Sequence, residues 1–103
     1  MRELTHATFS EHVGSRFRLQ VGESESIELE LIEATDHAAK DPNRDDRLRS
    51  APFSLVFRGP LDIPLPQQVF KLEHDALSAI EIFLVPIGPD KEAIGLCYEA
   101  VFN

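Results

Sequence analysis

The residue pattern closest to a metal site lies in the middle of the chain. Asp41, Asn43 and Asp45 have the D-x-N-x-D spacing with which a calcium-binding loop presents alternate oxygen ligands. The rest of such a loop is missing, because Asp46 stands where glycine is needed and Pro52 where a bidentate glutamate is needed. Arginines also alternate with these acids. We therefore predict a solvated loop, with no metal site and no cofactor.

Four histidines could serve as general bases or metal ligands, but their spacing favours neither role. His6 and His12 flank a short helical pattern, while His37 and His74 are isolated from other ligand types. His74 precedes Asp75, yet neighbours in a strand point to opposite faces, so the two do not form part of a catalytic triad. We expect His12 to cap helix carbonyl groups or to donate to a neighbouring chain.

The remaining reactive groups also have structural explanations. Cys97 lacks the basic neighbours or helix start that would stabilise a thiolate, so we expect a packed side chain. The glycines are scattered and form no phosphate-binding loop. Carboxylates predicted on strands could form a glycosidase-like pair, but exposed strand faces explain them equally well. These carboxylates are Glu28, Glu30, Glu73, Glu81 and Glu99. We identify no catalytic residue, and the sequence favours a protein that is not an enzyme.

Length and charge restrict the class of protein and its partners. The chain has 103 residues, a formal charge of −8 and a sequence pI near 4.8, which fit one acidic domain spanning residues 1–103. Such a charge repels phosphate backbones and anionic lipids, so we predict no nucleic-acid or membrane partner. The N-terminus does not resemble a signal peptide, and no apolar run approaches the roughly 18 residues of a membrane span. We therefore predict a cytoplasmic protein.

Alternating apolar and polar residues predict strands along most of the chain. The predicted strands cover residues 16–21, 27–32, 53–58, 69–74, 77–86 and 96–102. The alternation breaks at Leu31-Ile32, which indicates a bulge or bend. Residues 22–24 and 88–90 are predicted turns, and residues 37–51, which lack periodicity, a loop.

Two further segments complete the predicted fold. Thr8 and Glu11 have the T-x-x-E spacing of a capping box, which predicts a short helix between Thr8 and Gly14. Three prolines within residues 60–66 predict a stiff, extended connection. We therefore expect a mainly all-β domain, a small antiparallel β-barrel or sandwich of about six strands with one short N-terminal helix.

Several segments together resemble a bacterial domain family of unknown function. These are Leu4-Thr5 with Phe9 and His12-Val13-Gly14, residues 52–60 (PFSLVFRGP), residues 83–89 (FLVPIGP) and residues 98–103 (YEAVFN). The similarity extends over nearly the whole chain. It implies a short single-domain protein in a protein-assembly setting, associated with phage-tail-like or secreted-fibre components. It implies no catalytic residues.

The main hypothesis is a non-catalytic module that binds a protein partner or further copies of itself. Val56, Phe83 and Val85 are apolar at positions where the alternation predicts a solvent-facing side. They need a cover, which either the helix and the proline-rich connection or a partner supplies. We therefore predict an interface around these residues.

Two further residues are candidates for the same interface. Arg58, at the end of a strand, is expected to pair with a carboxylate such as Glu73 or Glu99. Tyr98 begins the last segment of the chain, whose strand edge is expected to accept a partner strand. Both expectations concern packing or binding rather than catalysis.

The alternative hypothesis is a small-molecule or enzymatic function in the mouth of a barrel. His12, His74, Arg58 and Glu99 are the polar side chains that would have to converge there. Whether they face one pocket distinguishes the two hypotheses.

Overall fold

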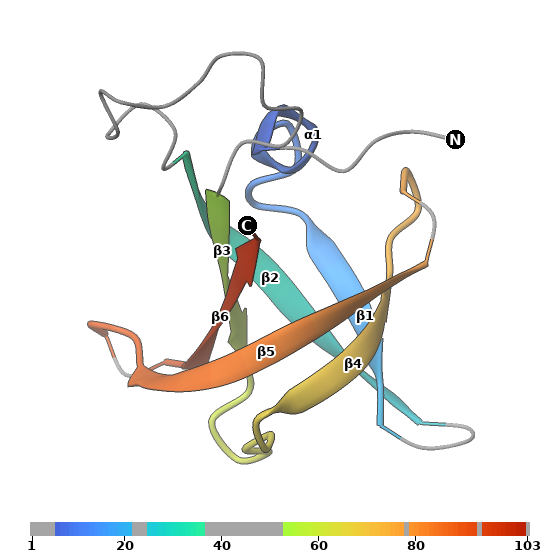
Figure 1. The fold of residues 1–103 in the computed structure, drawn as a ribbon. Coiled ribbons are helices and arrows are strands. Elements are labelled where there is room, and N and C mark those ends of the chain that lie inside the picture. Colours follow the sequence, from blue (N-terminus) through green and yellow to red (C-terminus); the bar gives the residue numbers. More distant parts are fainter. Residues whose placement is uncertain (1–5, 22–24, 37–52, 78, 93, 103) are drawn as a thin grey trace.

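The structure is a computed structural model and describes residues 6–21, 25–36, 53–77, 79–92 and 94–102. It contains one short helix and six strands (Figure 1). These are α1 (His6–Ser10), β1 (Arg16–Gln20), β2 (Ser26–Asp36), β3 (Phe53–Gly59), β4 (Gln68–Glu73), β5 (Ile80–Pro89) and β6 (Leu96–Phe102). The prediction of a mainly β domain with one short N-terminal helix is confirmed.

The strands form a closed antiparallel barrel in the order β1-β2-β3-β6-β5-β4. Two meanders, β1-β2-β3 and β4-β5-β6, are joined by the long β3–β6 ladder on one side and by the short β1–β4 ladder on the other. Between the two architectures left open by the sequence, the structure therefore shows the barrel. All seven residues of β6 are paired with β3, but only residues 96–99 are also paired with β5. The free strand edge expected from Tyr98 onward is therefore wrong at residues 98–99, whereas residues 100–102 are paired on one side.

Alternation places one apolar row of each strand inside the barrel. In β1, Phe17 and Leu19 are fully buried, whereas the residues between and beside them are half-buried or exposed. A six-stranded barrel is narrow enough for such side chains to fill it. Ten large side chains among the described residues have less than 2% exposure: Phe9, Phe17, Leu19, Leu29, Leu31, Leu55, Phe57, Leu72, Leu84 and Tyr98. The apolar residues chosen by period two therefore form the core.

Two β-bulges interrupt the ladders. The β2–β3 register shifts between Leu31 and Glu33, which confirms the bulge predicted at Leu31-Ile32. The second shift, between Pro86 and Gly88 of β5, was not predicted. Gly88 has φ +99°, a left-handed conformation that glycine adopts readily at bulges. Residues 88–89 consequently continue β5 instead of forming the predicted turn, and β5 begins at Ile80 rather than at residue 77.

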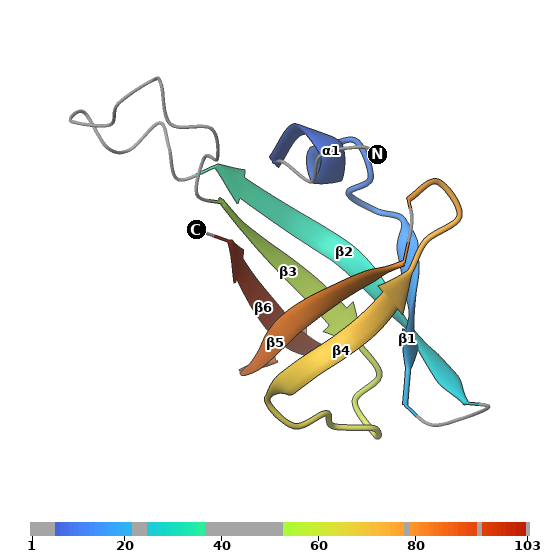
Figure 2. The same ribbon diagram turned by 45° about the vertical axis from the view of Figure 1, so that its right-hand side comes forward.

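α1 covers one end of the barrel (Figures 1 and 2). Its Phe9 is fully buried, with its ring centroid 5.9 Å from those of Phe53 and Phe102 and 6.5 Å from that of Phe17. The helix begins at His6, so Thr8 lies within it and the predicted capping box is wrong. Packing of Phe9 against the barrel sets the position of this five-residue helix, which is too short to be stable by itself.

The connection between β3 and β4 covers the opposite end of the barrel (Figure 1). Leu65 is buried there, and its backbone N–H donates to the Tyr98 hydroxyl at 3.0 Å. Leu61, Ile63 and the neighbouring prolines are exposed or half-buried. The predicted loop at 37–51 and the turn at 22–24 lie outside the described residues.

Candidate functional site

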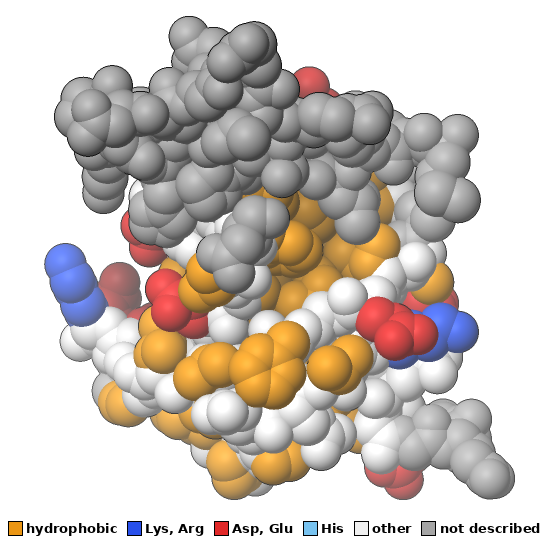
Figure 3. All heavy atoms as spheres, viewed as in Figure 1, with side chains coloured by type: hydrophobic (Ala, Val, Ile, Leu, Met, Phe, Trp, Pro, Cys, Tyr) orange, Lys and Arg blue, Asp and Glu red, His pale blue; other side chains and the backbone are white. Residues whose placement is uncertain are grey.

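Exposed apolar side chains gather on the outer surface of the second meander. Val69 of β4 and Phe83 of β5 are directly opposite each other in the ladder, and they are 55% and 48% exposed. Figure 3 shows hydrophobic side chains in a row along β5. A large aromatic ring that remains half exposed beside another exposed apolar residue is the kind of feature that marks an interaction surface.

The other predicted apolar residues lie on the same side of the barrel wall. Val56 of β3 and Val85 of β5 are both paired with Glu99 of β6, one from each side, and both are half-buried. The structure therefore brings Val56, Phe83 and Val85 onto one outer face, as the alternation predicted. We call this surface the outer patch; its members are Val56, Val69, Phe83, Val85, Ile87 and Val101.

A hollow of about 380 Å³ adjoins the outer patch between the two bulges. Ile32 and Ile87, the extra residues of the β2 and β5 bulges, both line it. Val56 and Cys97 line it from β3 and β6. A bulge leaves one residue unpaired and redirects its side chain, so the bulges supply apolar side chains to a surface that strict alternation would make polar.

Cys97 is unsuited to nucleophilic chemistry. The side chain is buried although it belongs to the outward-facing row of β6. Burial raises the pKa of its thiol, the charge of Asp90 raises it further, and the Arg58 guanidinium partly opposes both. A reactive thiolate needs a lowered pKa, so the expectation of a packed cysteine agrees with its surroundings.

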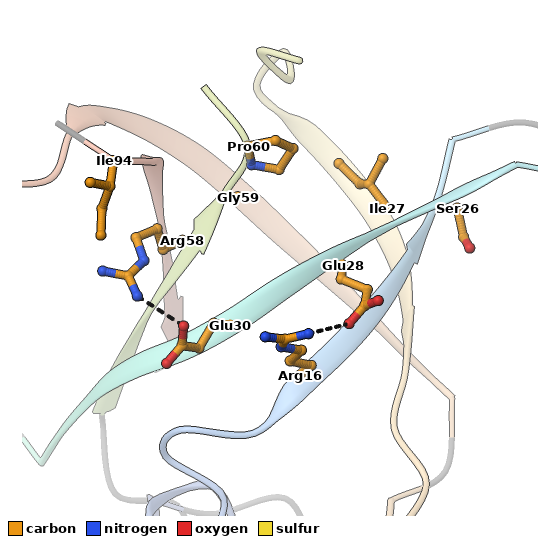
Figure 4. A pocket seen from close by; sticks show the side chains of 9 residues that line it. All are labelled: Arg16, Ser26, Ile27, Glu28, Glu30, Arg58, Gly59, Pro60 and Ile94. Atoms are coloured by element: carbon orange, nitrogen blue, oxygen red, sulfur yellow. Dashed lines mark hydrogen bonds and ion pairs between the residues drawn. The ribbon is translucent and has the colours of Figure 1, made fainter. Parts of the chain in front are cut away.

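Arg58 lies in a second, more polar groove on the outside of the first meander (Figure 4). Its guanidinium donates to Glu30 Oε1 at 2.9 Å and to Asp90 Oδ2 at 3.1 Å, and these hydrogen bonds raise the pKa of Arg58. The predicted carboxylate partners, Glu73 and Glu99, are therefore wrong. Glu30 lies directly opposite Arg58 in the β2–β3 ladder, and Asp90 directly follows β5.

Asp90 connects this ion pair to the hairpin between β5 and β6. Its Oδ1 accepts from the backbone N–H groups of Ile94 at 2.8 Å and Gly95 at 3.2 Å, while Oδ2 accepts from Arg58. Burial opposes ionisation of Asp90, but these donors together outweigh it and lower the pKa of the carboxyl group. Because Asp90 accepts from both Arg58 and the hairpin backbone, the main effect of this cluster is to fasten the hairpin to β3.

The same groove holds an exposed ion pair. Arg16 Nη1 and Glu28 Oε2 are 3.5 Å apart, with side chains 73% and 61% exposed (Figure 4). Such surface pairs contribute about 0–1 kcal/mol. The groove of about 490 Å³ is therefore lined by charges that are already balanced within the chain.

Tyr98 does not reach the outer surface. It is 1% exposed, its ring packs within the core, and its hydroxyl accepts the Leu65 N–H described above. The side chain of Tyr98 therefore takes no part in an exposed binding surface, contrary to the prediction. Tyr98 instead attaches the segment between β3 and β4, which covers one end of the barrel, to the barrel interior.

His12 and His74 come together beside α1, with ring centroids 4.7 Å apart. His74 Nε2 lies 3.0 Å from Ser15 Oγ, which resembles a serine–histidine dyad. However, the Ala76 N–H donates to His74 Nδ1 at 2.9 Å, so the ring proton is on Nε2 and donates to Ser15. A catalytic base must accept the serine proton through that nitrogen, and the arrangement therefore does not activate a nucleophile.

The four polar residues of the barrel-mouth hypothesis do not converge. His12 and His74 lie beside α1, near the end of the barrel where β3 begins with Phe53. Arg58 lies in the outer groove, where its guanidinium is paired with Glu30 and Asp90. Glu99 is on the outer face, between Val56 and Val85. The interior that would hold a ligand is occupied by the core side chains.

The described part of the chain has neither a metal-ligand cluster nor a membrane-spanning helix. It contains no group of three or more His, Cys, Asp or Glu side chains placed to hold a metal ion. The calcium-like segment at 41–45 is outside this part. No described helix has the length and apolar character needed to cross a membrane.

These observations define a small closed antiparallel barrel with ion-paired clusters that fasten its hairpins and an exposed apolar outer face. Residues 4–102 match the model of a family described as Domain of unknown function (DUF6916). The match covers nearly the whole chain, and the chain belongs to this family. This agrees with the resemblance to a family of unknown function noted in the sequence. No curated protein and no solved structure gives a significant match.

Sequence reasoning missed three contributors to these sites: Ile87, Val69 and Asp90. Ile87 belongs to a bulge whose only local signal is the following glycine. Val69 was assigned to a strand, but its exposure depends on which strands lie beside it. Asp90 was recognised only as a turn residue, because its ion pair with Arg58 joins positions 32 residues apart.

Proposed function

We propose that this domain is a non-catalytic interaction module that binds a protein partner through the outer patch. The carrying observation is the cross-strand pair of Val69 and Phe83, both about half exposed on adjacent strands of a rigid barrel. Aromatic side chains are enriched at the centres of protein interfaces, and a paired strand holds such a ring in place at little entropic cost.

The chemistry around the outer patch supports a partner with an apolar centre and a basic surround. Glu99 lies between Val56 and Val85, and Glu81 on the exposed row of β5 is directly opposite Lys71 of β4. The chain as a whole carries a formal charge of −8. Two copies would therefore repel each other at long range, whereas a basic protein would be attracted. We accordingly favour a different protein over self-association.

Two finer predictions belong with this proposal. The resemblance noted in the sequence implies a phage-tail-like or secreted-fibre assembly as the setting, and we further propose a cytoplasmic location. Both stay predictions. The proposal itself depends only on the outer patch and its acidic border.

The proposal is tested with a matched pair of charge-introducing variants. Phe83→Glu places a carboxylate in the outer patch, whereas Leu61→Glu places one at an apolar residue of nearly equal exposure, 47%, at the end of the barrel. Proteins captured from a native lysate by the wild-type chain are produced in pure form, and their affinity for each variant is measured by calorimetry at low and high salt. Circular dichroism verifies that both variants are folded.

We expect Phe83→Glu to weaken binding by about 30-fold or more, the effect of losing a central interface residue worth about 2 kcal/mol. Leu61→Glu should bind like the wild type, and added salt should weaken binding by both. Equal affinity of the two variants would contradict the proposal. Sedimentation showing that the wild type dimerises and Phe83→Glu does not would replace the partner with a second copy.

A further inference from the structure

The segment that joins α1 to β1 is attached to the barrel through a small cluster of polar side chains. Gly14 N–H donates to the Leu31 carbonyl at 2.7 Å, and the Leu31 N–H donates to the Ser15 carbonyl at 3.1 Å. Beyond these backbone bonds, the segment is held by His74, which follows β4 in the chain. The contacts of His74 therefore help to keep α1 over the end of the barrel.

The hydrogen bonds of this cluster form a chain, in which each group accepts from one neighbour and donates to the next. The Ala76 N–H donates to His74 Nδ1, and His74 Nε2–H donates to Ser15 Oγ. The Ser15 hydroxyl in turn donates to the His12 carbonyl oxygen at 2.5 Å. This sequence of donors requires a neutral His74, because Nδ1 must keep a free lone pair.

Protonation of His74 conflicts with this geometry. A proton on Nδ1 would point at the Ala76 N–H, so the 2.9 Å hydrogen bond would become a repulsive contact. The His12 ring packs on the other side, and its buried Nε2 has no hydrogen-bond partner among the described residues. It supplies no opposite charge to a protonated His74. Phe17, whose ring centroid is 4.6 Å away, also leaves the ring in apolar surroundings.

The charged groups around His74 act in opposite directions. Burial lowers the pKa of His74, and His12 and Arg18 lower it further, whereas Asp75 raises it. Asp75 is already paired with Arg18 at 3.0 Å, on an exposed part of the surface. The balance lowers the pKa of His74 below its ordinary value of 6.5 and favours the neutral ring near neutral pH.

We propose that His12, Ser15 and His74 form a pH-sensitive latch, which holds α1 over the end of the barrel near neutral pH and releases it under mild acidification. Release would uncover the aromatic cluster beneath α1, where the rings of Phe53 and Phe102 stack with centroids 4.5 Å apart and Phe9 packs against both. This inference is independent of the outer patch, because the two sites share no residue.

The sign of the effect follows from linkage. His74 has a lower pKa in the latched state than in the released state, where the ring is solvated. The latch is therefore fully effective above pH 6.5 and weakens as the pH falls from there toward the latched-state pKa. One proton changes the equilibrium between the latched and released states by at most about tenfold for each pH unit.

The test is hydrogen–deuterium exchange of the whole protein at about pH 7.5 and about pH 5.8, corrected for intrinsic exchange rates; both values lie above the sequence pI. We expect the protection of residues 9–17 to fall several-fold at the lower pH, by up to about fivefold. Protection of β3 and β6 should stay constant. Fluorescence of Nile red, an uncharged dye, should increase in parallel as the aromatic cluster becomes accessible.

Two variants distinguish a latch from general acid sensitivity. His74→Asn removes the titrating ring but leaves a side-chain carbonyl oxygen that can accept the Ala76 N–H. In this variant the protection of residues 9–17 should not depend on pH. Ser15→Ala should lower protection at both pH values and keep the pH dependence. His37→Asn, which changes a histidine outside the described residues, is the control for loss of a titrating ring and should behave like the wild type.

Two results would overturn the latch. Either His74→Asn shows the same pH dependence as the wild type, or residues 9–17 and the barrel strands lose protection together. In the second case acid acts on the whole fold. Unchanged protection of the wild type between the two pH values would also contradict the proposal.

Discussion

The aliphatic part of the Arg58 side chain lies directly against Gly95, in the space that a β-carbon at position 95 would occupy. The added carbon would meet Arg58 Cγ and would come within 2.7 Å of the Gly59 carbonyl oxygen. The absence of a side chain at Gly95 thus allows Arg58 to cross the hairpin and reach Asp90. This contact makes the strand end at Arg58-Gly59 a packing site.

Gly95→Ala should therefore destabilise the barrel. We expect the free energy of unfolding to fall by about 1–3 kcal/mol, the usual effect of inserting a carbon into a packed site, as measured by urea denaturation. In the double variant with Arg58→Ala the penalty should be smaller, since only the backbone contact with Gly59 remains. Wild-type stability of Gly95→Ala would show that the hairpin moves away without loss.

The Asp90 cluster should make stability depend on pH in the acid range. Because the folded-state pKa of Asp90 lies below its ordinary value of 3.8, the carboxylate stabilises the fold above that pH. This contribution is lost as the pH falls below 3.8 through the folded-state pKa. Asp90→Asn should be less stable than the wild type at pH 6, and the difference should shrink as the pH falls toward about 2.

Urea denaturation at several pH values measures this difference. Asp62→Asn, which removes an exposed carboxylate from the connection between β3 and β4, controls for the change in net charge. A difference between Asp90→Asn and the wild type that stays constant over the whole acid range would refute the linkage.

The hydroxyl of Tyr98 should stabilise the covered end of the barrel. Tyr98→Phe leaves the buried Leu65 N–H without its acceptor, and an unsatisfied buried donor costs about 1–3 kcal/mol. Amide exchange of Leu65 should accelerate more than that of core residues such as Leu84. If the Leu65 amide exchanges at its wild-type rate in the variant, the hydrogen bond contributes nothing measurable there.

The sequence predicted features that depend on neighbours in the chain. Period two identified the buried rows of the strands, and two consecutive apolar residues located the Leu31-Ile32 bulge, because both signals are local. The prediction of Val56, Phe83 and Val85 on one face also followed from alternation. A strand pattern assigns faces without assigning neighbouring strands, which is why it could not show that β6 lies between β3 and β5.

The incorrect predictions involve contacts between distant parts of the chain. Arg58 binds Glu30 and Asp90, which are 28 and 32 positions away, and eighteen acids were available as partners. Thr8 and Glu11 have capping-box spacing, but the anchoring of Phe9 inside the barrel shifts the helix start to His6. In each case, tertiary packing prevailed over a local preference.

The unequal ladders of the barrel determine an order of assembly. The β3–β6 ladder pairs seven residues on each strand, whereas the β1–β4 ladder pairs only two. The side-chain hydrogen bond between Gln20 and Glu73 across this short ladder joins positions 53 residues apart. Pairing β1 with β4 loses the most chain entropy and gains the fewest hydrogen bonds. We therefore expect this ladder to form last in folding and to break first in unfolding. The barrel thus passes through an open, curled sheet, in which β1 and β4 are briefly edge strands.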